Sequence, residues 1–306
     1  MLSHLTQQRL APVRHFFRTQ DDDDLLGCYA WAQAVSSGLL PILGDFEISL
    51  RNALHRSLSH YYSNQQTDSF NWMVPRPNPT PNPVKPYVNA PHAMSAKSNS
   101  NVLDVLRKKP NATPDDIVSA LTFGFWEQLI KSLDHVTHTK NNHLNLQYEI
   151  LSRAFPYAPF SQGITFGAQL FQKQVVDLLS RIRDIRNRVG HHDAIWKIPE
   201  FTDAGAIGFT PRHPRHTVKA IAEAINKVAW MAGWIDPAIP VYMQKTRHWS
   251  ALASLLTRQT LATYRLYGGC KSLHLESPGK MRRSKPENAE KIMSRIKQRK
   301  LHSYHF

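Results

Sequence analysis

The chain has 306 residues, of which 42% are hydrophobic, so it can bury a substantial core and is not disordered as a whole. Its 38 Lys and Arg residues against 23 Asp and Glu residues give a net charge of +15 and an isoelectric point near 9.9, which favour a polyanionic partner. Its two cysteines, Cys28 and Cys270, exclude a disulfide framework and a cysteine-based zinc site, and we expect both to be core thiols. The sequence has no apolar run of 18 residues and no secretory signal, so we expect a cytoplasmic protein.

The first segment of the chain is predicted to be helical. One helical region covers roughly residues 2–17, and Pro12 is expected to bend it. Four aspartates at positions 21–24 then precede an apolar segment. Four carboxylates suit the positive end of a helix dipole better than they suit a metal site, so we expect them to cap a helix.

Two helices, at about residues 25–36 and 39–62, are predicted next, with residues 36–38 as the turn between them. The second helix has an apolar residue at every fourth position, at Phe46, Leu50, Leu54 and Leu58. This pattern predicts a packed helical hairpin. Glu47 and Arg51 are also four residues apart, and an ion pair within the helix is the simplest interpretation of them.

A proline-rich segment follows. Seven prolines lie between residues 73 and 92, at positions 75, 77, 79, 81, 83, 86 and 91. They exclude a helix or the interior of a sheet, and favour an extended connection across the surface. Residues 93–102 are polar and are expected to be irregular, and a short element at 102–106 ends before Pro110.

A helix is predicted to begin at Thr113, because an N-cap threonine, a first-turn proline and two aspartates follow one another there. It is expected to continue through Leu121 and beyond, and Gly124 and Trp126 are expected to serve packing. The histidines of residues 135–143 are spaced three and then five apart, which favours a polar loop over a metal site.

The strongest helical pattern comes next. Its apolar stripe is formed by Val175, Leu178, Leu179, Ile182, Ile185 and Val189. Acid-to-base pairs four residues apart, Asp177 with Arg181 and Asp184 with Arg188, add support for a helix.

The end of this helix brings together an arginine, an amide and two imidazoles, at Arg186, Asn187, His191 and His192. Asn187 and His191 share one helix face, whereas Arg186 and His191 diverge by roughly 140° on a straight helix. Gly190 lies between them and can end or bend the helix, which would bring His191 toward Arg186. Alternatively, the two groups converge only with a second copy of the chain.

Residues 200–216 are predicted to be a loop with basic residues near its end, which either contacts phosphates or is a basic connector. Amphipathic helices are predicted at 217–234 and 249–267. Few segments show the period-two pattern of a strand. The fold class is therefore all-α.

The C-terminal tail is strongly basic. Residues 280–306 contain nine Lys or Arg and two Glu, a net charge of +7. A solvated basic helix and an RNA-contacting arm are equally good interpretations of it. We expect one helical domain over residues 1–275, including the Pro-rich connection at 73–92, and a separate basic tail at 276–306.

Residues 186–196, RNRVGHHDAIW, resemble the Arg-Asn-three-residues-His signature of HEPN ribonucleases, and in particular that of the Abi-like (AbiD/AbiF-type) abortive infection proteins. Gly190 stands where that family usually has alanine. Residues 29–37 with 43–54 are similar to the family's Tyr/Trp helix and Glu-x-x-x-Arg-Asn helix, and residues 121–126 resemble its Phe-Gly-x-Trp motif. The three matches occur in the family's order.

The resemblance implies a HEPN-like helical bundle with additional helices, and a metal-independent endoribonuclease of an anti-phage defence or toxin-antitoxin system. In such an enzyme the ribose 2′-hydroxyl attacks the neighbouring phosphorus, so no cofactor is expected, and the products carry a 2′,3′-cyclic phosphate and a 5′-hydroxyl. His191 would transfer the proton, because an imidazole titrates near neutral pH. Arg186 would hold the scissile phosphate through its planar fork of donors.

Supporting roles follow for four further residues. Asn187 would either orient His191 from one turn below or fix the loop after Gly190, and His192 is either a second proton carrier or a structural residue. On the same resemblance, Arg51 would point into the RNA groove with Glu47 orienting it. Arg51 to His55 is a poor second copy of the motif, so the resemblance implies a homodimer with a composite active site, which an antitoxin RNA or protein would silence.

Two alternatives belong to other functional classes. In a non-catalytic HEPN RNA-binding or scaffold protein, the same arginine and histidine would bind phosphate without cleaving RNA. Salt-dependent RNA binding with no product would favour it. A DNA-binding regulator is less favoured, because no helix-turn-helix signature stands out.

Overall fold

The computed structural model describes residues 2–70, 72–73, 76–77, 83, 87–88, 95–134, 146–160 and 163–267. Over these ranges the chain is all-α, as predicted, apart from one pair of two-residue strands. The elements are η1 (Leu2–His4), α1 (Gln7–Phe17), α2 (Asp22–Tyr62), β1 (Arg76–Pro77), β2 (Tyr87–Val88), α3 (Ala96–Lys108), α4 (Pro114–Ala120), α5 (Phe123–Lys131), α7 (Leu146–Ala154), α8 (Gln169–Gly190), α9 (Pro214–Ile235), α10 (Ala238–Lys245), α11 (Arg247–Leu255) and α12 (Arg258–Tyr267). The histidine-rich stretch at 135–143, Cys270 and the basic tail at 276–306 lie outside the described residues.

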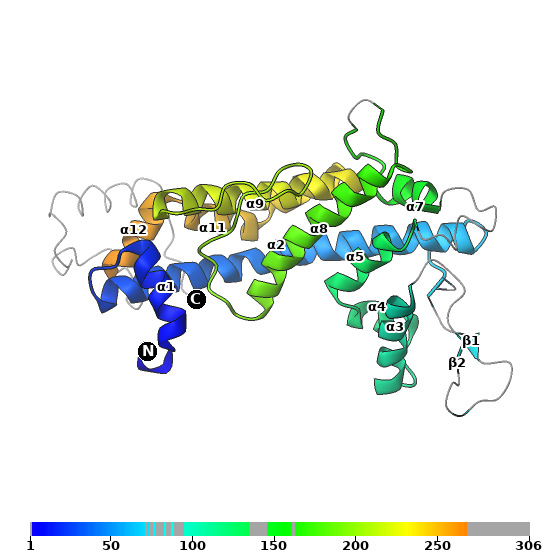
Figure 1. The fold of residues 1–306 in the computed structure, drawn as a ribbon, viewed down its shortest axis with the longest axis horizontal. Helices are drawn as coiled ribbons and strands as arrows, with labels where there is room; N and C mark the ends of the chain where they lie inside the picture. The colour runs from blue at the N-terminus through cyan, green and yellow to red at the C-terminus, as the bar shows by residue number, and fades with distance from the viewer. Residues whose placement is uncertain are drawn as a thin grey trace.

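One helix, α2, runs along most of the length of the molecule (Figure 1). With a rise of about 1.5 Å per residue, its 41 residues span about 60 Å. The helices α1, α5, α7, α8, α9, α11 and α12 all pack against it. The fold is therefore a bundle built around α2.

The prediction of a helical hairpin is wrong, because residues 36–38 lie inside α2. A β-carbon on Gly38 would stand 3.1 Å from Leu252 Cδ1, so this glycine makes room for α11. Ser36 is buried, and its hydroxyl donates a hydrogen bond of 2.7 Å to the carbonyl of Asp193. The small residues that resemble a turn in the sequence serve close packing between helices instead.

The start of α2 is capped as predicted. The carboxylate of Asp21 accepts a hydrogen bond of 2.8 Å from the N–H of Asp24. The Asp24 side chain in turn accepts two hydrogen bonds, of 2.6 and 2.8 Å, from the guanidinium of Arg265 in α12. One turn further on, a β-carbon on Gly27 would stand 2.1 Å from the backbone oxygen of Tyr264, so α12 packs directly on this glycine.

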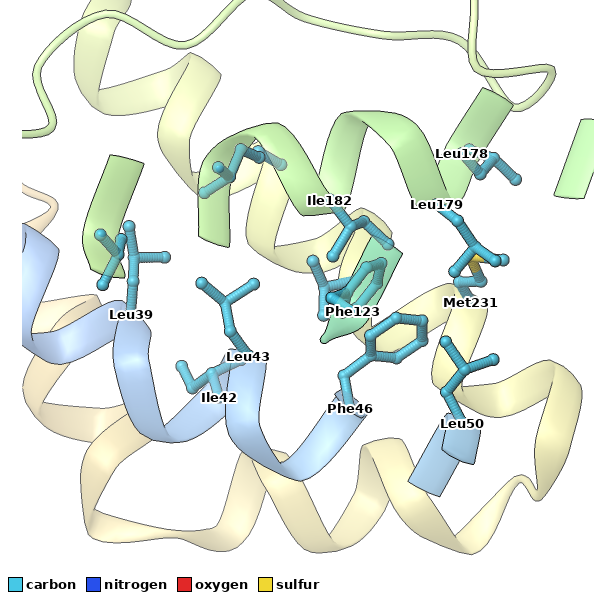
Figure 2. Packing of buried hydrophobic residues seen from close by; sticks show 14 of the residues in the cluster. Leu39, Ile42, Leu43, Phe46, Leu50, Phe123, Leu178, Leu179, Ile182 and Met231 are labelled. Carbon is cyan, nitrogen blue, oxygen red and sulfur yellow. The ribbon is translucent and has the colours of Figure 1, made fainter. Parts of the chain in front are cut away.

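The core lies between α2 and the helices that cross it. Figure 2 shows side chains of α2, α5, α8 and α9 meeting there: Leu39, Ile42, Leu43, Phe46, Leu50, Phe123, Leu178, Leu179, Ile182 and Met231. The apolar face predicted from the four-residue step of α2 is confirmed, since all four of its side chains are buried. Cys28 is also in this core, as predicted, and burial raises the pKa of its thiol to about 12.

Three boundaries differ from the predictions. The helix α3 begins at Ala96, in a segment predicted to be irregular, because Ser95 caps it. The predicted capping at Thr113 is confirmed, but that helix ends at Ala120, and an extended residue, Leu121, separates α4 from α5. The helix predicted at 249–267 is two helices, α11 and α12, and α10 was not predicted.

Prolines lie both in the Pro-rich connection and inside two helices, α1 and α2. The Pro-rich connection contains β1 and β2, which pair antiparallel with Arg76 opposite Val88 and Pro77 opposite Tyr87. Pro12 lies inside α1, and Pro41 lies inside α2 without ending it. The short ladder is compatible with prolines because it has no interior strand.

In the part of the chain that the structure describes, α2 is the one helix long and apolar enough to cross a membrane. Within its most apolar window, however, 61% of the helix is buried inside the fold. The long central helix of a bundle has this property, because it is surrounded by other helices. The hydrophobicity of α2 is thus accounted for by the core.

Two glycines of α2 provide a test of this packing. Gly27→Ala is expected to lower the free energy of unfolding by about 1–3 kcal/mol or more, because the new methyl group collides with the backbone of α12. Gly44→Ala meets no atom within 4 Å and should stabilise the helix by up to about 1 kcal/mol. Chemical denaturation followed by circular dichroism measures both values, and similar effects of the two substitutions would contradict the proposed contact.

Candidate functional site

The helix α8 ends at the predicted motif, and the turn that ends it fixes both histidines. His191 is the C-cap residue, and its N–H donates to the carbonyl of Asn187 at 2.9 Å. His192 has a φ of +56°, in the left-handed region. The helix therefore stops at Gly190 as predicted, but the left-handed residue that reverses the chain is His192, at the position following the C-cap.

Arg186 is held by a carboxylate from another helix. Its Nε donates a hydrogen bond of 3.3 Å to Glu47 Oε2 of α2, although the two residues are 139 apart in the sequence. Neither terminal amino group of Arg186 bonds to another described residue. One of them, Nη1, lies 3.8 Å from where a β-carbon on Gly190 would stand, so an alanine at this position would fit without a clash. The guanidinium is thus oriented from one edge and open at the other.

The ion pair expected between Glu47 and Arg51 is not formed, because Glu47 is engaged by Arg186. Arg51 is half-buried, and its Nε has no hydrogen-bond partner among the described residues. One turn further along α2, His55 accepts a hydrogen bond of 3.0 Å from Trp72 Nε1 and stacks on Phe70. Burial lowers the pKa of His55, and its contacts with Trp72 and Phe70 are those of a packed side chain.

His191 and His192 are both exposed at the end of α8, and Asn187 is half-buried. No hydrogen bond joins Arg186 to His191 within the part of the chain that the structure describes. Asn187 contacts His191 through its backbone carbonyl. The fold therefore brings Arg186 and Glu47 together and places His191 nearby on the same helix end, facing solvent.

The segment after His192 is anchored to the bundle. Arg188 donates to the carbonyl of Lys197 at 2.8 Å and lies 3.8 Å from the carboxylate of Asp193, and burial lowers the pKa of its guanidinium. The hydroxyl of Ser36 accepts from the N–H of Ile195 at 2.9 Å. These contacts hold the chain that leaves the motif against α2, so the motif sits on a fixed support.

The pairs predicted along α8 are replaced by others. Asp177 pairs with Lys173 at 2.5 Å instead of with Arg181. Asp184 lies 3.6 Å from Arg181 and does not pair with Arg188. Arg188 instead contacts the carbonyl of Lys197 and the carboxylate of Asp193, which lie beyond the end of the helix. The spacing of residues along the helix could not indicate these acceptors.

A second arginine on α8, Arg183, is also held by a carboxylate, and the sequence pattern did not indicate this pair. Glu127 of α5 has only 3% of its side chain exposed and pairs with Arg183, and with Lys131 at 2.8 Å. A β-carbon on Gly124 would stand 3.8 Å from Arg183 Cδ, so this motif glycine lies beside the arginine. The one signal available was Glu127 itself, the single carboxylate of α5, which directly follows the apolar residues Phe125 and Trp126. Trp126 is fully buried, which confirms the predicted packing role.

A pocket of about 510 Å³ lies elsewhere, between residues 200–208 and α9. Its charged lining is Glu200, Asp203, Glu223 and Lys227, and Lys227 Nζ lies 4.8 Å from the centre of the Trp230 ring. None of the predicted site residues lines this pocket. Nor do three His, Cys, Asp or Glu side chains gather into a metal-ligand group among the residues described.

The two arginine–carboxylate pairs of α8 are expected to contribute different amounts to the free energy of unfolding. Glu127→Gln should lower the free energy of unfolding by about 1–3 kcal/mol, because the buried group loses the charge that two cations share. Glu47→Gln should cost less than about 1 kcal/mol, since Arg186 is 37% exposed. Denaturant titrations of both variants test this order, and an equal or larger loss at Glu47 would contradict it.

Comparisons with known proteins place the chain in a family. A sequence model of the Abi-like protein family matches residues 4–197, that is 194 of the 306 residues. No curated protein and no solved structure matches the chain. The matched range contains all six predicted site residues, and α9 to α12 lie beyond it. Membership of such a family suggests a role in abortive infection defence, and the chain belongs to the Abi-like protein family.

Proposed function

We propose that the protein is a metal-independent HEPN-type endoribonuclease of an abortive infection or toxin-antitoxin system, which acts on RNA in the cytoplasm as a homodimer. The observation that carries this proposal is the arrangement of Arg186. Its guanidinium is held on one edge by Glu47 and open on the other, at a helix end that also carries an exposed histidine.

The open edge of Arg186 suits a phosphate. A guanidinium presents its donors as a planar fork that matches two oxygens of a phosphoryl group. With Nε occupied by Glu47, the terminal amino groups are left for the substrate. A carboxylate behind an arginine also fixes its rotamer, so the group does not have to be ordered when RNA binds.

His191 is proposed as the proton carrier of the reaction. The ribose 2′-oxygen forms a bond to the adjacent phosphorus while the bond from phosphorus to the 5′-oxygen breaks. A base takes the proton of the 2′-hydroxyl, and an acid gives a proton to the departing 5′-oxygen. Arg186 stabilises the negative charge that develops on the phosphoryl oxygens. The products are a 2′,3′-cyclic phosphate and a 5′-hydroxyl.

The geometry also supports a second copy of the chain at the site. The attacking and departing oxygens lie on opposite sides of the phosphorus, so one imidazole is poorly placed to serve both. Each chain has a single clear motif, and His191 faces solvent. Two copies related by a twofold axis would place two such helix ends against one linkage. An antitoxin RNA or protein that covers this helix end would silence the enzyme.

Replacing the two central groups tests the proposal. Loss of a general acid or base costs about 10²- to 10⁴-fold in rate, so His191→Ala should cut RNA slower than the parent protein by about 100-fold or more. Loss of a group that stabilises developing charge costs about 10²- to 10³-fold, so Arg186→Ala should be slowed on a similar scale. Incubation with total RNA in chelator, followed by mapping of the new chain ends, measures this and identifies the cyclic phosphate.

A matched control uses the exposed pair on α11, where Arg247 and His248 are also an arginine and a histidine. Arg247→Ala with His248→Ala should leave cleavage unchanged. If the parent protein binds RNA in a salt-dependent way but yields no product on any RNA, the non-catalytic scaffold is the better description. If His191→Ala cuts as fast as the parent protein, the assignment of the proton carrier is wrong.

The contribution of the His192 imidazole to cleavage can be measured without disturbing the left-handed backbone at this position. A φ of +56° is unfavourable for most residues and favourable for glycine, so His192→Gly should keep the turn intact while removing the imidazole. If His192 is structural, cleavage by His192→Gly stays within a few fold of the parent. A loss as large as that of His191→Ala would assign it to proton transfer. Single-turnover cleavage rates measure the difference.

A further inference from the structure

A compact basic cluster lies before and at the start of α9, outside the residues matched by the family. It consists of Arg212, His213, Arg215 and His216. Arg212 and Arg215 are exposed, and neither has an ion pair with another described residue. Arg215 Nε donates a hydrogen bond of 3.0 Å to His216 Nε2, and the rings of His213 and His216 are 5.8 Å apart. Two arginines and two histidines are thus gathered here, and neither arginine has an ion pair with a described carboxylate.

An exposed aromatic ring adjoins this cluster. Phe209 has 45% of its surface exposed, and its ring centre lies 5.3 Å from that of His216. The backbone of Phe209 is fixed, because its carbonyl accepts a hydrogen bond of 2.8 Å from the N–H of Glu200. The residue is therefore anchored through its backbone, and its partly exposed ring contacts His216 of the cluster.

Most of the carboxylates nearby are neutralised by lysines. Asp203 pairs with Lys227, and Glu223 lies 3.1 Å from Lys219. The pKa of His216 is lowered, first by desolvation and then by the charges of Arg215, His213 and Arg258, against which only Glu200 acts in the opposite direction. The start of α9 lies at the same end of the bundle as α12, which begins with Arg258 (Figure 1). The charged groups that act on His216 are therefore mostly positive.

Phe209 contacts His216, and His216 accepts a hydrogen bond from Arg215, so an exposed aromatic ring and arginines without ion pairs belong to one segment. Exposed aromatic rings together with such arginines are the combination that binds single-stranded nucleic acid, where a base stacks and the backbone is neutralised. A double helix offers no unstacked base to such a ring. The adjacent pocket does not suit phosphate, because three carboxylates and one lysine line it. The surface formed by Phe209, Arg212 and Arg215 is thus distinct from the pocket in its chemistry.

We propose that residues 209–216 bind single-stranded RNA, with a base stacked on Phe209 and the flanking phosphates held by Arg212 and Arg215. This inference rests on the proposed RNA substrate. It adds a second contact with the same strand, at a surface outside the cleavage site. Such a surface gives affinity without strong sequence preference, because every base has a stacking face. Selection of the cleaved linkage is then left to the end of α8.

Binding of a fluorescent single-stranded RNA to full-length His191→Ala protein, followed by anisotropy over a series of salt concentrations, tests the proposal. Adding Arg212→Gln with Arg215→Gln should reduce the slope of log affinity against log salt by about 1.4, or about 0.7 for each lost phosphate contact. Adding Phe209→Ala should weaken binding about five-fold or more. Gel analysis of the probe shows separately whether it is cut.

Matched controls remove equal charge and equal aromatic surface elsewhere. Lys97→Gln with Lys108→Gln alters two exposed lysines of α3, and Tyr242→Ala removes a ring of α10 that is 63% exposed. Both controls should bind RNA as the His191→Ala protein does. Equal losses in the controls, or no loss in the residue 209–215 variants, would overturn the proposal. Cleavage of the probe would instead count against the assignment of His191 and leave the binding result intact.

Discussion

The structure depends on α2 being continuous. A helix of 41 residues that is surrounded by others must present small residues wherever a neighbour comes close, and Gly27 and Gly38 do so for α12 and α11. The same helix carries Glu47, which holds Arg186, and Ser36, which holds the chain after His192. One rigid element thus positions both sides of the candidate site, and a break in it would separate them.

Two arginines of α8 are held by carboxylates from two different helices, and they differ in burial. The side chain of Glu127 is buried, and its ion pair with Arg183 links α5 to α8 at the edge of the core. Glu47 and Arg186 lie nearer to solvent, where an ion pair contributes little to stability and can serve orientation instead. Arg183 uses both of its terminal amino groups, on Glu127, Ser180 and Asp184, whereas Arg186 is bonded only through Nε among the described residues. The proposed role of Arg186 in binding phosphate rests on this difference.

The chain combines two parts with different relations to the family. Residues 4–197 match it and contain the motif, the central helix and the carboxylates that hold the arginines. The helices α9, α11 and α12 lie beyond the match, yet they pack on α2 and complete its burial. The basic cluster at the start of α9 belongs to this second part. The proposed RNA contact would therefore be a property that this chain adds to a shared core.

The sequence by itself determined the all-α class, the apolar faces of α2 and α8, the cap at Asp21 and the family, because periodicity, capping and motif order are local properties. It did not determine that residues 36–38 stay helical or that Glu47 pairs with Arg186. Both depend on which neighbour arrives from elsewhere in the chain: Leu252 and Asp193 for the small residues, and an arginine 139 positions away for the carboxylate. Glu47 and Arg51 have ideal spacing for a pair within one helix, and only the tertiary structure decided that a guanidinium from α8 takes the carboxylate instead.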